Sequence, residues 1–216
     1  MGAAASSTIV VDSLTALGAF NESHVSAAVV PREGHVALAS YLSRLVRIHE
    51  RPLRATLRFS DEGGGVEGLE AIAERLPSDD ALDSLVEDVA FWAEVVADLT
   101  GVPNVSVYLG PAACRRDARF CSTVWSLRLV TSYGAPAAEW IEEDERRRRL
   151  AGAGVIDSLR DTVGLAPIRR CGPGDVVLLK GDGWPSDVRT RGALHRVPWT
   201  STWAPPPLVL ELLPFF

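Results

Sequence analysis

Two side chains in the second half of the sequence combine a thiol with an imidazole. They are Cys121 and His195, and Glu139 adds a carboxylate between them along the chain. A thiolate and an imidazole can bind a soft or borderline metal such as Zn or Cu, with Glu139 or Cys114 as a further ligand. They can equally form a dyad for nucleophilic or acid–base work. In a third interpretation Cys121 is a small hydrophobic residue and His195 a core histidine.

The strongest strand pattern of the chain contains Cys121 and covers residues 120–133. Its odd-numbered residues are mostly apolar or aromatic, and its even-numbered residues are more polar. Because side chains alternate between the two faces of a strand, we expect the odd set to line a core or a pocket. Arg128 belongs to the even set, so we expect it to have a structural role and to pair with Glu139. The residues expected to share the face of Cys121 are Thr123, Trp125 and Tyr133.

The first half of the chain, residues 1–103, has mainly helical patterns. Its clearest helix begins at Ser78, carries acidic residues in its first turn that suit the helix dipole, and ends at Gly101. These helices are expected to brace the outside of a sheet. Further helices are expected over 13–20, 34–49 and 66–76, and strands over 24–30 and 53–59.

From residue 104 onward the apolar period changes to two, and short strands separated by Gly and Pro turns follow. The strands expected there include one over 175–179, one over 193–197 that carries His195, and a closing strand over 208–213. This layout predicts a single α+β domain over 1–216. Its N-terminal part, 1–103, is mainly helical, and 104–216 form a sandwich-like or barrel-like β core.

Composition excludes several classes of partner. The net charge is -6, and no basic stripe is interleaved with aromatic residues, so nucleic acid is not an expected partner. No run of 18 or more apolar residues predicts a membrane span. Three cysteines without metal-finger spacing favour a reducing cytoplasm. Lys180 is the only lysine beside 21 arginines, which is typical of a GC-rich bacterial genome.

A series of short motifs follows in order over roughly residues 104–213. They are 120 (F), 127–129 (LRL), 131–133 (TSY), 134–140 (GAPAAEW), 174–176 (GDV), 180–181 (KG) and 195–198 (HRVP). Together they resemble a bacterial family of unknown function, DUF1826, whose members carry Phe-His-x-Asp at the first of these positions. More broadly, they resemble the double-stranded β-helix of cupins and of 2-oxoglutarate/iron oxygenases.

The resemblance implies a site that departs from its family. In this fold a His-x-Asp pair and a distal histidine hold Fe(II). The distal histidine corresponds to His195, but the first histidine and the aspartate correspond to Cys121 and Thr123. The stretch over 205–210 also lacks the basic residue with which the oxygenases hold 2-oxoglutarate. We therefore expect 2-oxoglutarate not to be a cofactor, and any divalent metal (Fe, Zn or Cu) to bind at His195 and Cys121.

These observations predict a small-molecule biosynthetic enzyme with a rebuilt or lost iron site and an apolar or aromatic substrate. It would be an unconventional oxygenase or a metal-independent cyclase or isomerase, with Cys121, His195 and Glu139 as catalytic residues. The alternative is a non-catalytic ligand-binding or metal-handling protein derived from the same fold. The residues expected to bind the substrate are Thr123, Trp125, Tyr133, Trp184, Trp199 and Trp203.

Overall fold

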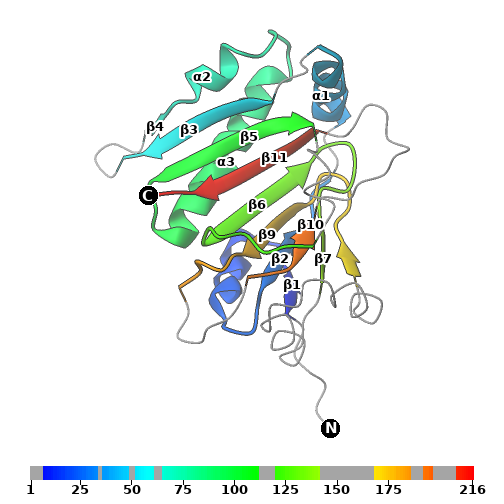
Figure 1. Ribbon diagram of the computed structural model, residues 1–216. Helices are drawn as coiled ribbons and strands as arrows, with labels where there is room; N and C mark the ends of the chain where they lie inside the picture. Colours follow the sequence, from blue (N-terminus) through cyan, green and yellow to red (C-terminus); the bar gives the residue numbers. More distant parts are fainter. Residues whose placement is uncertain are drawn as a thin grey trace.

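The computed structural model describes residues 7–33, 36–48, 52–60, 65–111, 120–141, 168–185, 192–196 and 208–216. Cys114, Trp199 and Trp203 lie outside the described residues. Within the described ranges the chain is α+β. A large sheet carries helices on one face, and a smaller sheet packs on the other (Figure 1).

The large sheet has eight strands in the order β1-β2-β9-β6-β11-β5-β3-β4. All its neighbours are antiparallel except β1 and β2, which are parallel. Its strands are β1 (Thr8–Val10), β2 (Ala27–Val30), β3 (Leu53–Phe59), β4 (Val66–Glu67), β5 (Asn104–Pro111), β6 (Leu127–Ser132), β9 (Val176–Lys180) and β11 (Leu208–Pro214). The small sheet has the order β10-β7-β8, with β7 (Glu139–Ile141), β8 (Ile168–Arg170) and β10 (His195–Arg196).

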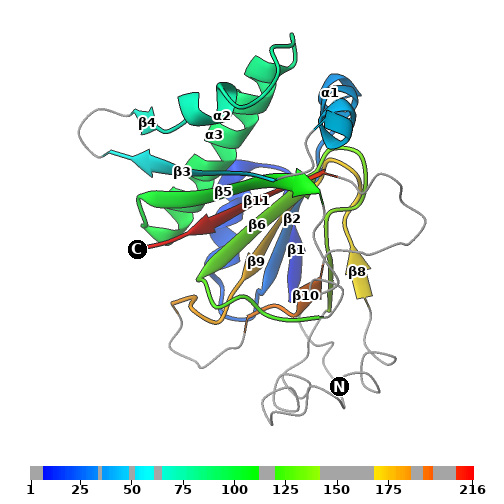
Figure 2. The same cartoon turned by 45° about the horizontal axis from the view of Figure 1, so that its top comes forward.

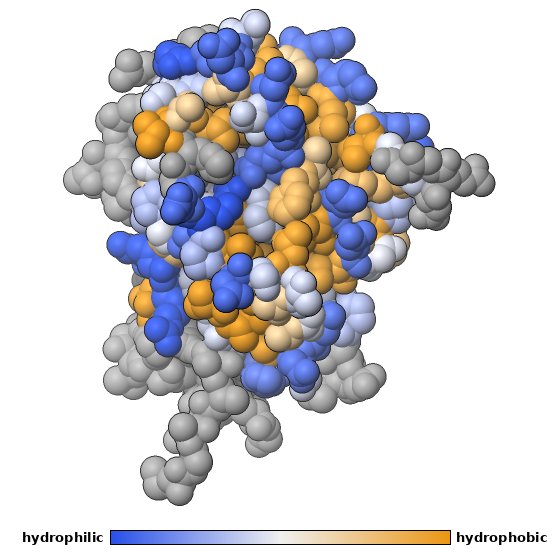
Figure 3. Space-filling view, turned by 180° about the vertical axis from the view of Figure 1, so that it is seen from behind, coloured by the Kyte–Doolittle hydropathy of each residue, from blue (hydrophilic) through white to orange (hydrophobic). Residues whose placement is uncertain are grey.

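The helices cover one face of the large sheet. They are η1 (Leu14–Asn21), α1 (Val36–Ile48), α2 (Glu70–Ala73) and α3 (Leu82–Thr100). Figure 2 shows α1 over the end of β5, with α3 running behind the strands. No helix among the described residues is long and apolar enough to cross a membrane. Viewed from behind, apolar residues gather along the middle of this side between polar ones (Figure 3).

The long helix α3 follows its apolar pattern but starts later than predicted. Leu85, Val89 and Val96 recur at helical spacing and are fully buried against the sheet. At the start, Asp79 accepts a hydrogen bond from the backbone of Ala81, so Asp79 and Asp80 precede the helix, and the acidic residue of its first turn is Asp83. At the other end Gly101 adopts the left-handed conformation (φ 64°) of a helix C-cap.

The first half of the chain supplies strands as well as helices. The strand predicted over 53–59 is confirmed as β3, and the closing strand as β11. In contrast, the helix predicted over 66–76 is wrong, because the segment begins as β4 and only Glu70–Ala73 is helical. Gly68 turns the chain between them with φ 99°, and a Cβ there would lie 2.3 Å from the carbonyl oxygen of Thr56.

A buried ion pair joins the helices to the sheet. Arg32, which follows β2, donates from Nη1 to Oδ1 of Asp88 on α3 at 2.5 Å, and both side chains are less than 15% exposed. The indole of Trp92 and the hydroxyl of Tyr133 also donate to this carboxylate. Burial and the nearby Asp88 carboxylate raise the pKa of Tyr133, so its hydroxyl stays protonated and remains a donor.

The guanidinium of Arg32 has further acceptors on strand β6 and in the turn before β9. It donates from Nε to the carbonyl oxygen of Gly174 at 2.7 Å and from Nη2 to Oγ1 of Thr131 at 3.1 Å. The ring centroids of Trp92 and Tyr133 lie 5.5 and 5.6 Å from Cζ of Arg32. One buried cation therefore connects β2, α3, β6 and the turn before β9.

We expect Asp88→Ala to lower the free energy of unfolding by ~3–5 kcal/mol, because it leaves the buried Arg32 without its counter-charge. Urea unfolding followed by circular dichroism measures this. The control is Asp98→Ala on the exposed side of the same helix, which should change stability by less than about 0.5 kcal/mol. Equal losses in the two variants would contradict this account of the ion pair.

Candidate functional site

Cys121 and His195 lie directly opposite each other on neighbouring extended segments. Each backbone N–H donates to the other residue's carbonyl oxygen at 3.0 Å, which is the hydrogen-bonded pair of an antiparallel ladder. The structure therefore brings together the two residues singled out from the sequence. They differ in environment, since Cys121 is exposed and His195 is only 1% exposed.

A glycine-rich crossing holds the segment before β6 in place. A Cβ on Gly181 would lie 1.9 Å from the carbonyl oxygen of Trp125, so the two backbones can approach only with glycine at this position. The next residue, Asp182, accepts hydrogen bonds from the Ser122 hydroxyl at 2.8 Å and from the backbone of Gly192 at 2.7 Å. These contacts fix the segments that carry the thiol and the imidazole relative to β9.

Both nitrogens of the His195 imidazole are engaged. Nδ1 lies 2.8 Å from the carbonyl oxygen of Ala193, and Nε2 lies 2.8 Å from Nη1 of Arg128. A carbonyl oxygen only accepts and a guanidinium only donates, so the proton is on Nδ1 and Nε2 is an acceptor. Burial, together with the positive charge of Arg128, lowers the pKa of His195 to about 3. The ring is therefore neutral over the physiological range.

Arg128 is the functional candidate that the sequence analysis missed. Its Nη2 donates to Oε1 of Glu211 on the neighbouring strand β11 at 2.5 Å, and the two side chains are 12% and 17% exposed. Its Nε is buried, and none of the described residues accepts a hydrogen bond from it. A partly buried cation whose Nε–H has no acceptor among the described residues thus lies beside His195.

The predicted assignment of strand faces explains this miss. The odd-numbered residues Leu127 and Leu129 line a core as predicted, but the even-numbered face is also buried and was wrongly expected to be merely polar. Strand β6 begins only at Leu127, and Leu127 and Leu129 pack in the core under the helices. Val130 on the other face packs toward the small sheet, the side on which Arg128 contacts His195. The charge of Arg128 could have identified it from the sequence. An arginine in a strand that is apolar on both faces becomes buried and needs a buried acceptor.

Glu139 holds the small sheet together. Its side chain is 3% exposed and accepts hydrogen bonds from Nε of Arg170 at 2.9 Å and from Nε of Arg196 at 2.7 Å. The predicted pairing with Arg128 is therefore wrong. Burial acts to raise the pKa of Glu139, but the hydrogen bonds and charges of Arg170 and Arg196 lower it overall. Glu139 is consequently an ionised carboxylate on β7 that binds one arginine of β8 and one of β10.

Two of the aromatic residues predicted to bind substrate, Tyr133 and Trp184, lie on the face of the large sheet opposite to His195. Tyr133 donates to Asp88 on the helix side of the large sheet. The ring of Trp184 packs edge-on against the ring of Phe20 on that same side, with 5.2 Å between the two ring centroids. Trp125 is 41% exposed in the segment before β6, and Thr123 is half-buried there.

The residues present do not fit a facial iron site. With Nδ1 protonated, His195 has only the Nε2 lone pair to offer a metal, and Arg128 donates to it. Thr123 stands where the resemblance places the aspartate, and a neutral hydroxyl is a poor ligand. No group of three or more His, Cys, Asp or Glu side chains that could hold a metal occurs in the described part of the chain.

The neutral state of His195 predicts a pH dependence of stability. Because the folded-state pKa is about 3 and the ordinary value is 6.5, the unfolded chain binds more protons between these values and stability falls as the pH drops. We expect a loss of about 2 kcal/mol between pH 7 and pH 5, a window above the titration of Glu139. Urea unfolding of the wild type and of His195→Gln at both pH values measures it. An equal loss in the variant would contradict the assignment.

None of the curated proteins matches this sequence. Among solved structures, the chain is similar to the crystal structure of the non-heme alpha ketoglutarate dependent epimerase SnoN from nogalamycin biosynthesis. The identity is 14%, the match covers 87% of this chain and 77% of that chain, and the TM-score is 0.41. A family described as "Protein of unknown function (DUF1826)" matches residues 11–212. As its motifs predicted, the chain belongs to the DUF1826 family.

Proposed function

We propose that this protein is an iron-independent enzyme of small-molecule biosynthesis built on a double-stranded β-helix of the cupin and oxygenase type. The observation that carries the proposal is the 2.8 Å contact between Arg128 Nη1 and His195 Nε2. A guanidinium takes the lone pair that a metal ion would need, while a positive charge remains at the centre of the site. In this proposal the guanidinium of Arg128 takes the place of the metal ion as the positive charge of the site.

The strand order supports the choice of fold. Four strands that follow one another in the sequence as β5, β6, β9 and β11 are neighbours in the large sheet. Their order in the sheet is β5-β11-β6-β9. The strands between them, β7, β8 and β10, form the small sheet, and the bridge at Cys121 adds to its β10 edge. The chain therefore passes back and forth between two layers of four extended segments each. An eight-stranded jelly roll has this arrangement. Cys121 and His195 then occupy adjacent positions in the layer that holds iron in the oxygenases.

The side chains suggest distinct roles. Arg128 has donors to stabilise an anionic group or an oxyanion that develops during a reaction, and it acts in a partly dry site where such stabilisation is large. Cys121 is exposed and next to the site, so it is our candidate for the nucleophile or the acid–base group. His195 orients Arg128 as a neutral acceptor, and Glu139 is structural.

The second candidate function is ligand binding without turnover. It is favoured by the fact that both His195 nitrogens and two guanidinium nitrogens of Arg128 are already bonded within the protein. Groups that are engaged in this way transfer protons poorly, which favours a role in holding a ligand over a role in catalysis.

The loss of iron can be tested by measuring metal content in protein purified without chelator or immobilised nickel. We expect less than about a tenth of an equivalent of any transition metal per chain, because the donor set lacks two of the three ligands of a facial site. Near-stoichiometric metal that His195→Ala removes would overturn the proposal. A matched rebuilt variant, Cys121→His with Thr123→Asp and Arg128→Met, is expected to gain Fe(II) binding that the Arg128→Met control lacks.

Catalysis and binding are separated by incubating the protein with a bacterial small-molecule extract and following the mixture by mass spectrometry. If Cys121 is catalytic, Cys121→Ala should abolish conversion of the affected compound while costing only ~1 kcal/mol in the free energy of unfolding. Arg128→Met should weaken retention of the same compound. A compound that is retained but never converted by the wild type would decide for the ligand-binding alternative.

A further inference from the structure

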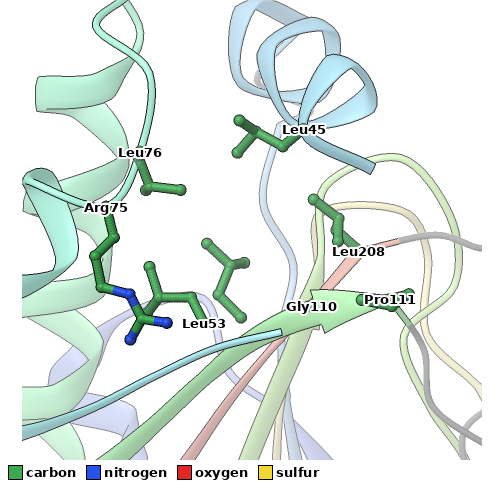
Figure 4. A pocket seen from close by; sticks show the side chains of 8 residues that line it. Leu45, Leu53, Arg75, Leu76, Gly110, Pro111 and Leu208 are labelled. Atoms are coloured by element: carbon green, nitrogen blue, oxygen red, sulfur yellow. The ribbon is translucent and has the colours of Figure 1, made fainter. Parts of the chain in front are cut away.

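A cavity of about 250 Å³ lies on the helix-bearing face of the large sheet, the face opposite to that on which Arg128 contacts His195. Figure 4 shows side chains from α1, from the segment after α2 and from the ends of β3, β5 and β11 pointing toward this space. Nothing in the proposed reaction uses it. Its walls include Leu45, Leu53, Leu76, Leu109 and Leu208.

One charged group borders these apolar walls. Arg75 is exposed, and its Nη1 donates to the carbonyl oxygen of Arg54 at 3.0 Å, which holds the guanidinium at the edge of the cavity. In the described part of the chain no carboxylate pairs with Arg75. The remaining N–H groups of the guanidinium are therefore available to an anion.

The geometry points to a second binding site whose ligand is a small amphipathic carboxylate, with its chain among the leucines and its carboxylate on Arg75. A neutral apolar molecule would leave the guanidinium unused, and a small inorganic anion would leave the apolar walls without contacts. A cavity of about 150 Å³ holds benzene. The larger volume here suits a longer apolar group, such as the seven-carbon tail of octanoate.

A chain-length series of straight-chain carboxylates tests the apolar part by isothermal titration calorimetry on the full-length protein. From butanoate to octanoate, affinity should rise by about fourfold per methylene as apolar surface is buried. Beyond the length that fills the cavity the gain should stop, so dodecanoate should bind no more tightly than decanoate. A gain that continues to dodecanoate would indicate detergent-like adsorption and would overturn the proposal.

The charge is tested with Arg75→Met, which keeps an apolar stem and removes the guanidinium. Octanoate should bind this variant about fivefold more weakly, and 1-octanol should bind the wild type and the variant equally. The matched control is Arg58→Met, an exposed arginine on β3 that does not line the cavity, and it should leave octanoate binding unchanged. Equal effects of the two substitutions would overturn the role of Arg75.

The location is tested in the wild-type protein, so that it does not depend on a variant that folds. A carboxylic acid with a photoreactive diazirine on its chain should label peptides that contain Leu45, Leu76 or Leu109, and octanoate should compete with this labelling. In addition, Leu76→Trp should fill the cavity and lower octanoate affinity at least tenfold, given that its side chain lines the space. Labelling confined to other peptides would overturn the proposal.

Discussion

A guanidinium that is withdrawn from water must be given acceptors, and Arg128 imposes this constraint on the centre of the molecule. Its side chain is 12% exposed and lies between the carboxylate of Glu211 and the imidazole of His195. The demand for acceptors keeps His195 neutral with its proton on Nδ1. It also removes the one lone pair with which His195 could bind a metal. A single arginine thereby sets the protonation state of His195 and occupies its remaining lone pair.

The same rule recurs on the other side of the sheet and at its edge. Arg32 and Asp88 join the helices to β2, and Glu139 joins the three strands of the small sheet through Arg170 and Arg196. Each pair connects segments far apart in the sequence, so each has meaning only in the folded chain. Removal of one partner would leave an unpaired buried charge, which is why such pairs specify one arrangement of the elements more than they add stability.

The large sheet separates two groups of side chains that differ in chemistry. On one face Arg128, His195 and Cys121 bring together charge, hydrogen bonding and a thiol. On the other face leucines surround a cavity that has one arginine at its border. Both faces belong to the same strands, and β11 contributes Glu211 to the first and Leu208 to the second. The alternation of side chains along a strand makes this double use possible.

The sequence by itself determined the family, the α+β class, most elements and the closeness of Cys121 and His195, because these depend on local patterns and on motifs in a constant order. It did not determine which face of β6 meets the small sheet, since Leu127 and Val130 make both faces apolar enough for a core. Nor could it show that Arg128 would contact His195 and that Glu139 would bind two other arginines. Pairing between distant charges depends on strand register and on which layer covers which face, and only the tertiary structure decides these.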